Sequence, residues 1–262
     1  QQFVTDSTLL DTRALGRILN FDREHGLVKV EAGIQWPALV NGLLKAQQSE
    51  KRQWGIRQKQ TGADRLSIGG ALGANVHGRG LKMKPLVEDV EAFELVNAKG
   101  ELLTCSRKEN QELFKLTIGG YGLMGLIYSV TLRLARRQKV RRLVKVIKLD
   151  EFLPSLEKRT QDGFTYGDFQ YDIDEKSDTF MRRGVFSCYQ PVADDVPVPE
   201  KQKELDHDDW LKLILLAYVD RKKVFDTYAD YYLSTSGQTY WSDTHQMSVY
   251  IDEYRKFIDA KT

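Results

Sequence analysis

Glycine is concentrated in one short segment of this 262-residue chain, LSIGGALGANVHGRG, which spans residues 66–80. Five of the 20 glycines fall between residues 69 and 80. Each glycine costs a regular element roughly 0.5–1 kcal/mol relative to alanine, so this density indicates either turns with positive φ or a close approach of the backbone to another group. Small side chains accompany the glycines, namely Ser67, Ala71, Ala74 and Asn75.

Two interpretations of this segment stay open. In the first, it lies flat against a large planar or phosphorylated ligand, with exposed N–H groups as donors and a helix N-terminus near Gly70 facing an anion. In the second, it is a close-packed helix crossing. His77 ends the run of small residues and precedes Gly78. A lone histidine is more often structural than catalytic, but here it would face the same ligand and could hydrogen-bond a ring carbonyl or a substrate.

A second glycine segment, GGYGLMG over 119–125, matches the G-x-G-x-x-G pattern of nicotinamide-binding folds. Those folds need a strand before the glycines, a helix after them and an acidic residue about 20 positions on. Here the preceding SRKENQELFKL predicts a helix that starts at a capping box of Ser106 and Glu109. The following LIYSVTLRL predicts a strand, and residues 133–149 contain no Asp or Glu. The order of elements therefore argues against a nicotinamide cofactor.

Periodicity predicts the other elements. Alternation in LIYSVTLRL places Leu126, Tyr128, Val130, Leu132 and Leu134 on one face. We expect strands over 26–32, 90–96 and 101–105, the last two as a hairpin, and a helix over 36–47 with Pro37 in its first turn. In the second half we expect a helix over 150–161, strands over 164–173 and 179–189, a loop over 190–209 and one long helix over 209–233. The basic run 133–148 is better explained as a domain junction entering a strand than as a nucleic-acid or anionic-membrane patch.

Composition excludes several classes of protein. The net charge of +2 does not favour nucleic acid, and no apolar run approaches the 18 residues of a membrane span. Cys105 and Cys188 are too few for a disulfide scaffold, and the four histidines lack metal-ligand spacing. We therefore expect no metal and a cytoplasmic protein.

The segments TGADRLSIGGALGANVHGRG and VEDVEAFELVNAKGELLTCSRKENQELFKLTIGGYGLMGLIYSVTLRL together resemble the vanillyl-alcohol-oxidase-type (PCMH-type) family of FAD-binding oxidoreductases. The nearest branch is the bacterial FAD-linked oxidases related to sugar-lactone and alditol oxidases and to the decaprenylphosphoryl-ribose oxidase. The resemblance covers about residues 1–135. It implies an α+β fold, with an FAD-binding domain over 1–135 followed by a cap, or substrate, domain over 136–262 built of an antiparallel sheet and helices.

The resemblance also implies where FAD would lie. Residues from 62 to 70 would line the pyrophosphate and ribityl region, those from 74 to 77 the ribityl chain and isoalloxazine, and the backbone near Ile127 the adenine half. The implied cofactor contacts are Gly62, Ser67, Ile68, Gly69, Gly70, Ala74, Asn75, Val76, His77, Gly125 and Ile127. The family's first phosphate loop precedes the equivalent of Gln1, and its C-terminal return also lies outside the sequence, so we expect both domains to be incomplete.

In the second half, YWSDTHQMSVY over 240–250 combines aromatic and polar groups, as carbohydrate-like sites do. A turn in which Ser242 or Asp243 caps a helix explains the same residues. The resemblance implies hydride transfer from a CH–OH carbon of a small polar, sugar-like substrate to FAD, with oxygen or another carrier as electron acceptor. His77 is the candidate flavin- or substrate-facing group, and His245, oriented by Asp243, is the candidate base. The alternative is a non-catalytic module that keeps the fold without flavin.

Overall fold

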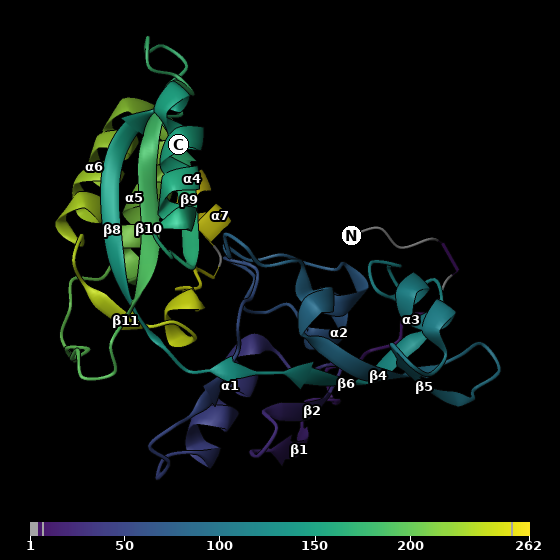
Figure 1. Cartoon of the computed structure of the whole chain (residues 1–262). Coiled ribbons are helices and arrows are strands. Elements are labelled where there is room, and N and C mark those ends of the chain that lie inside the picture. The colour runs from purple at the N-terminus through teal and green to yellow at the C-terminus, as the bar shows by residue number, and fades with distance from the viewer. Residues whose placement is uncertain (1–4, 7, 253) are drawn as a thin grey trace. The chain divides into compact units, whose positions relative to one another are not determined.

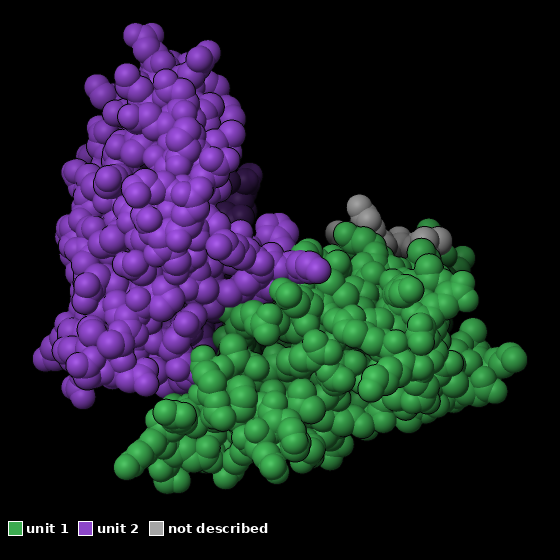
Figure 2. Space-filling view, in the orientation of Figure 1, with its two compact units in different colours: residues 1–57, 65–76, 85–136 green, residues 58–64, 77–84, 137–262 purple. Residues whose placement is uncertain are grey.

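The computed structural model describes residues 5–6, 8–252 and 254–262 (Figure 1). The chain forms two compact units, coloured separately in Figure 2. Unit 1 comprises residues 1–57, 65–76 and 85–136, and unit 2 comprises residues 58–64, 77–84 and 137–262.

Unit 1 is built on a five-stranded antiparallel sheet in the order β1-β2-β6-β4-β5. Its strands and helices are β1 (Ile18–Asp22), β2 (Leu27–Glu31), α1 (Trp36–Ala46), β3 (Trp54–Gly55), α2 (Ile68–Gly73), η1 (Leu86–Asp89), β4 (Val90–Val96), β5 (Leu102–Ser106), α3 (Gln111–Thr117), β6 (Leu126–Arg133) and β7 (Ala135–Arg136). The predicted strand at 26–32 and the predicted hairpin are confirmed, since Val96 pairs with Leu102 across the turn.

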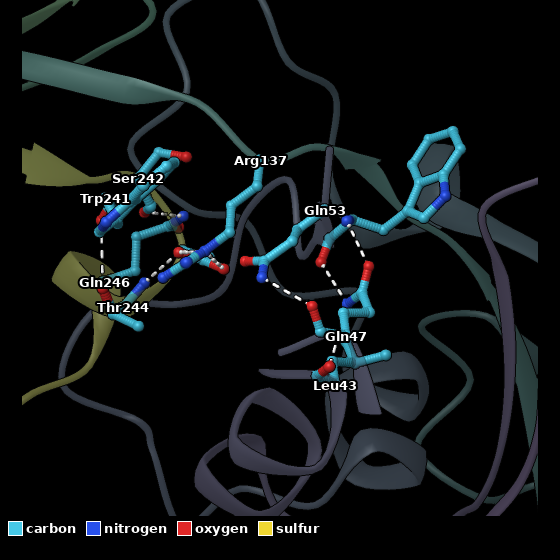
Figure 3. A network of polar contacts seen from close by, with 10 residues as sticks. Leu43, Gln47, Gln53, Arg137, Trp241, Ser242, Thr244 and Gln246 are labelled. Atoms are coloured by element: carbon cyan, nitrogen blue, oxygen red, sulfur yellow. Dashed lines mark hydrogen bonds and ion pairs between the residues drawn. The ribbon is translucent and has the colours of Figure 1, made fainter. Parts of the chain in front are cut away.

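Helix α1 also matches its prediction, with a proline in its first turn and an inward face of Leu39, Val40 and Leu43. Gln47 secures the end of this helix (Figure 3). Its amide nitrogen donates to the carbonyls of Leu43 and Trp54, both at 3.0 Å, and its amide oxygen accepts from the N–H of Trp54 at 2.6 Å. One buried amide thereby joins the last turn of α1 to β3.

The predicted face of β6 is only partly correct. Val130, Leu132 and Leu134 are buried as expected, but Ile127 is buried and Tyr128 is half-buried. The cause is a β-bulge: Ser129 pairs with Glu94 and Ile127 with Leu95, so one residue of β6 has no counterpart on β4. An extra residue in one strand reverses which side chains point inward, and a strictly alternating pattern cannot show it.

The predicted start of α3 is wrong. The helix begins at Gln111, five residues after Ser106. Ser106 ends β5, and its hydroxyl accepts hydrogen bonds from the N–H groups of Lys108 and Glu109, at 3.1 and 3.0 Å. Asn110, at φ 46°, then turns the chain into the helix. The hydroxyl closes a turn after a strand instead of opening a helix, because serine stabilises both structures through the same bond.

Unit 2 has a four-stranded antiparallel sheet in the order β11-β8-β10-β9. Its elements are β8 (Lys139–Lys148), α4 (Leu149–Gln161), β9 (Tyr166–Tyr171), β10 (Arg183–Val192), α5 (His207–Val219), α6 (Arg221–Ser234), β11 (Thr239–Trp241), η2 (Thr244–Gln246) and α7 (Tyr254–Asp259). Helix α4 packs on one face of the sheet through Phe152 and Leu156, and α6 packs on the other through Phe225 and Ala229, with α5 outside α6 (Figure 1).

Strand β8 confirms the strand expected in the basic run, and α4 confirms the helix expected over 150–161. The two strands expected over 164–173 and 179–189 also form, as β9 and β10, but their ends differ from the prediction. The long helix predicted over 209–233 is wrong, because it is two helices, α5 and α6. Asp220 separates them with an extended backbone at φ −151°, and its carboxylate caps α6 by accepting from the N–H of Lys223 at 3.0 Å.

Candidate functional site

The interpretation of the glycine-rich segment as a close-packed helix crossing is confirmed at Gly69, whereas its contact with a ligand stays a prediction. A Cβ on Gly69 would lie 2.8 Å from the Cβ of Ala32, so this glycine permits close packing. A Cβ on Gly73 would meet nothing within 4 Å, and Gly70 is exposed. Gly70, Gly73 and Ala74 have the i, i+3, i+4 spacing of one helix face. The helix therefore packs through one glycine and presents a nearly side-chain-free face through the others.

The predicted anion site at the start of α2 is wrong. The first N–H groups of the helix are already bonded: Ile68 donates to the carbonyl of Ile34 at 2.9 Å and Gly69 to that of Ala32 at 2.7 Å. The N–H of Gly70 donates to the hydroxyl of Ser67 at 3.2 Å. Donors that bond within the chain are not available to a phosphate. The predicted contacts Ile68 and Val76 place their side chains in the core.

The second glycine segment lies after α3 and before β6, which confirms the order of elements that argued against a nicotinamide fold. Its N–H groups close the other end of α2, since Gly119 donates to the carbonyl of Leu72 at 3.1 Å and Tyr121 to that of Gly73 at 2.9 Å. Positive φ angles at Gly119, Gly122 and Gly125 make this turn possible. The loop is thus a cap for α2.

The remaining predicted cofactor contacts lie in three places. Asn75, at φ 44°, follows α2, accepts a hydrogen bond from the N–H of Val87 at 3.1 Å, and lines a cavity of about 470 Å³ with Arg107, Phe114 and Lys115. Gly125 and Ile127 lie at the start of β6, where Ile127 pairs with Leu95. Gly62 belongs to unit 2, and its N–H donates to the hydroxyl of Ser248 at 3.1 Å.

His77 also belongs to unit 2, and its side chain is exposed. Its Nδ1 lies 3.1 Å from the carbonyl oxygen of Gly78. Since a carbonyl can only accept, Nδ1 carries the proton of the neutral ring and Nε2 is left as the proton acceptor.

A cavity of about 720 Å³ lies in unit 2 and is lined by residues of several elements. Arg142 comes from β8, Tyr231 and Tyr232 from α6, Tyr240 and Trp241 from β11, and His245 from η2. The sequence singled out the last three and missed the others.

Arg142 is the charged group of this cavity, and only 4% of its surface is exposed. Its Nε donates to the hydroxyl of Tyr189 at 3.0 Å, Nη1 to the hydroxyl of Thr235 at 2.8 Å, and Nη2 to Nε2 of His245 at 2.8 Å. Burial opposes its charge, but its interactions with Tyr189, Tyr240 and Tyr232 outweigh burial and raise the pKa of Arg142 above the usual arginine value. The guanidinium is therefore charged.

His245 stacks on Tyr240, with ring centroids 3.7 Å apart, and its Nε2 also lies 3.2 Å from the hydroxyl of Tyr189. Because an arginine can only donate, Nε2 is an acceptor and the proton of the neutral ring sits on Nδ1. Burial, followed by the positive charges of Arg142 and Arg79, holds the pKa of His245 well below its usual range. The ring is neutral at physiological pH.

Asp243 has partners other than the expected one. Its carboxylate accepts from Nε of Arg137 at 2.7 and 2.9 Å and from the N–H of Thr244 at 2.8 Å, where it caps η2. Gln246 closes the same turn by donating to the carbonyl of Ser242 at 2.9 Å (Figure 3). The capped turn therefore exists, and it delivers the ring of His245 to the cavity. Orientation of His245 by Asp243 stays a prediction.

One signal in the sequence could have found Arg142. In β8 every second side chain points inward, and the inward positions include Val140, Arg142 and Val144. A basic residue therefore occupies a buried position of the strand. Charged residues are rarely buried unless they are paired or functional. Because residues 133–148 contain eight basic residues, the sequence alone does not set Arg142 apart.

Within the described ranges, no cluster of His, Cys, Asp or Glu side chains is suited to a metal ion. In the same residues, no helix combines the length and the apolar character needed to cross a bilayer.

Known proteins resemble this chain most clearly in its first half. A family model described as "FAD binding domain" matches residues 1–106. The L-gulono-1,4-lactone dehydrogenase of Mycobacterium tuberculosis is 31% identical over 156 residues, which are 57% of this chain and 34% of that protein. The L-gulonolactone oxidase of Mus musculus is 31% identical over 130 residues, 49% of this chain and 28% of that protein. The chain thus spans about a third or less of the length of these relatives.

A crystal structure of cholesterol oxidase from Brevibacterium sterolicum has the same fold, with a TM-score of 0.66 at 17% identity over 92% of this chain and 49% of the other. Residues 1–106 are therefore an FAD-binding domain. The sequence motifs predicted an FAD-binding domain in this part of the chain and FAD as its cofactor, and the family model agrees with both.

The residues of α2 fit FAD through shape and not through phosphate donors. Gly73 leaves room for a flat group along the helix, because a Cβ there would enter open space, whereas a Cβ on Gly70 would lie 3.1 Å from the side chain of Leu66. Ser67 and Asn75 frame this face but already bond to the chain through their side-chain oxygens. These residues would hold the extended, uncharged portion of the cofactor. No N–H at the start of α2 serves the pyrophosphate, as shown by the bonds of residues 68–70.

Proposed function

We propose that this protein is an FAD-dependent oxidoreductase that oxidises a CH–OH group of a small polar, sugar-like substrate. The observation that carries the proposal is the FAD-binding domain at residues 1–106, which accompanies a cavity of about 720 Å³ in unit 2 lined by tyrosine, tryptophan, arginine and histidine. Such a lining favours a hydroxylated ligand, since aromatic faces pack on its C–H groups while fixed polar groups orient its hydroxyls.

In this proposal, residues 1–135 supply the cofactor domain and residues 136–262 the substrate domain. When bound, FAD supplies a two-electron acceptor for the hydride of the CH–OH carbon. The protein must hold that carbon in place and accept the hydroxyl proton. Nε2 of His77 has the free lone pair that a base requires, because Nδ1 bonds to Gly78. Nδ1–H of His245 is a donor suited to a substrate oxygen.

Relatives named for gulonolactone and galactonolactone support a sugar-derived substrate, and the non-catalytic alternative is not favoured by the match to an FAD-binding domain. The electron acceptor, oxygen or another carrier, is an open part of the proposal. A cytoplasmic location stays a prediction.

The test uses the complete purified protein. We expect flavin absorbance after purification or after addition of FAD, and bleaching of that absorbance when a polyol or an aldonolactone is added without oxygen. His77→Ala should slow this bleaching at least tenfold, whereas His207→Ala should leave it unchanged, because His207 lies exposed at the start of α5 and bonds Asp208. A protein that is colourless and takes up no FAD would refute the proposal.

A further inference from the structure

The cavity of unit 2 has an unbalanced set of polar groups. Arg142, Tyr240 and His245 all face it, and each offers hydrogen-bond donors. The acidic side chain in its lining, Glu204, is exposed. The other arginine, Arg79, already has a carboxylate, since its Nη1 lies 2.8 Å from Asp168. The inner part of the cavity is therefore rich in donors and poor in acceptors.

Arg142 is the first component of this imbalance. A buried arginine normally has a carboxylate partner, because an isolated charge away from water is costly. The described partners of Arg142 are the hydroxyls of Tyr189, Thr235 and Tyr231 and the neutral ring of His245. Within the part of the chain that the structure describes, no ion pair includes Arg142. The guanidinium thus has neutral acceptors and no counter-charge.

Tyr240 is an independent second component. Its ring is 4% exposed, and its hydroxyl is a buried polar atom without a hydrogen-bond partner among the described residues. A buried hydroxyl left unbonded is destabilising, because it has lost its hydrogen bonds to water. Tyr240 is a residue of the cavity lining, and the guanidinium carbon of Arg142 lies 4.9 Å from the centroid of its ring. A ligand acceptor at this place would satisfy the phenol and the guanidinium together.

His245 completes the set. Its Nε2 accepts from Arg142, so its Nδ1–H is the remaining polar group of the ring. We propose that this cavity binds an anionic oxygen group of the ligand, a carboxylate or a phosphate, with Arg142 as its counter-charge and Tyr240 and His245 as further donors. Carboxylate and phosphate oxygens only accept, so they match the guanidinium and the Nδ1–H of His245, which only donate, and the hydroxyl of Tyr240, which can donate. That this ligand is the substrate rests on the proposed function. The substrate would then be an acidic sugar.

Binding is measured by isothermal titration calorimetry on the complete protein, with gluconate as the carboxylate probe, glucose 6-phosphate as the phosphate probe and sorbitol as the neutral probe. We expect at least one anion to bind tenfold or more tightly than sorbitol, and the better anion identifies the group. Arg142→Gln should remove that preference. Arg141→Gln is the matched control, because Arg141 is the preceding residue of β8 and is exposed. It should preserve the preference.

A variant of Arg142 could disturb folding, so Tyr240→Phe provides a second measurement. It removes only the unbonded hydroxyl, keeps the ring against His245, and should weaken binding of the preferred anion about 5-fold or more at unchanged Tm. Equal binding of sorbitol and both anions, binding of neither anion, or an anion preference that survives in Arg142→Gln would overturn the inference. Flavin reduction is followed in parallel. If sorbitol alone reduces the flavin, the anion site is refuted and the oxidoreductase proposal stands. If an anion binds but no probe reduces the flavin, the oxidoreductase proposal is refuted and the anion site stands.

Discussion

Replacing Gly73 by alanine tests whether this glycine leaves room for the cofactor, in contrast to Gly69, which permits close packing of α2. Gly73 has no positive φ, and an added Cβ would meet nothing within 4 Å, so alanine fits the folded chain. Because alanine is the better helix former, the free energy of unfolding should stay constant or rise by up to about 1 kcal/mol. If FAD lies along the face of Gly70 and Gly73, the same methyl group intrudes on the cofactor. Such overpacking costs about 1–3 kcal/mol, or roughly a 5- to 150-fold weaker affinity.

The assay combines thermal unfolding of the protein without flavin and titration with FAD, followed by quenching of flavin fluorescence. Gly69→Ala is the contrasting variant, since its Cβ would lie 2.8 Å from Ala32, and it should lower Tm. Gly16→Ala is the neutral control, because its Cβ would meet only the carbonyl oxygen of Arg13, at 3.8 Å. Unchanged affinity for FAD in a stably folded Gly73→Ala protein would refute the placement of the cofactor on this face.

Three further predictions concern stability. Because the pKa of His245 is lowered in the folded protein, the unfolded chain binds a proton at a pH where the folded chain does not. The free energy of unfolding is therefore highest above the unfolded pKa of about 6.5 and falls as the pH drops below it. Between pH 7.5 and 5.5 urea titrations should show a loss of about 1.4 kcal/mol that His245→Gln lacks. Gly125→Ala should lower the free energy of unfolding by about 2–5 kcal/mol, because φ is +139° and the new Cβ would collide with the carbonyl oxygen of Val96. Gly122→Ala, whose Cβ meets nothing within 4 Å, should lower it by about 1–2 kcal/mol. Equal losses of the two variants in denaturant titrations would contradict this. Asp243→Asn breaks the buried ion pair with Arg137 and should lower the free energy of unfolding by about 3–5 kcal/mol. Asp162→Asn breaks the exposed pair with Lys158 and should lower it by less than about 1 kcal/mol. Denaturant titrations that find both variants as stable as the unmodified protein would contradict this.

Local patterns predicted most of the elements because they depend on neighbours in the chain. Alternation found β2, β4 and β8, and the 3.6-residue period found α1. The break between α5 and α6 escaped, although Asp220 is a good capping residue, because apolar residues continue on both sides of it. The bulge in β6 escaped as well, since its cause is the register with β4 and not the sequence of β6 itself.

The candidate site shows the same limit more sharply. Gly69 and Gly73 are indistinguishable in the sequence, yet one meets Ala32 and the other open space. His245 was found through its distinctive neighbours. Arg142 was not, because what sets it apart is that its partners among the described residues are neutral, and the partners of a side chain are fixed only by tertiary structure.

The path of the chain constrains how this protein can be divided. Residues 58–64 and 77–84 come early in the sequence but belong to unit 2. They bring Asp64, which accepts from the N–H of Ser248 at 2.8 Å, and Arg79, the ion-pair partner of Asp168. A fragment cut at residue 137 would lose both contacts, together with Leu81 beneath α4. Unit 2 is thus not a detachable C-terminal module, because the smallest continuous piece that contains all of it is residues 58–262. Domain exchange and split reporters have to respect that boundary.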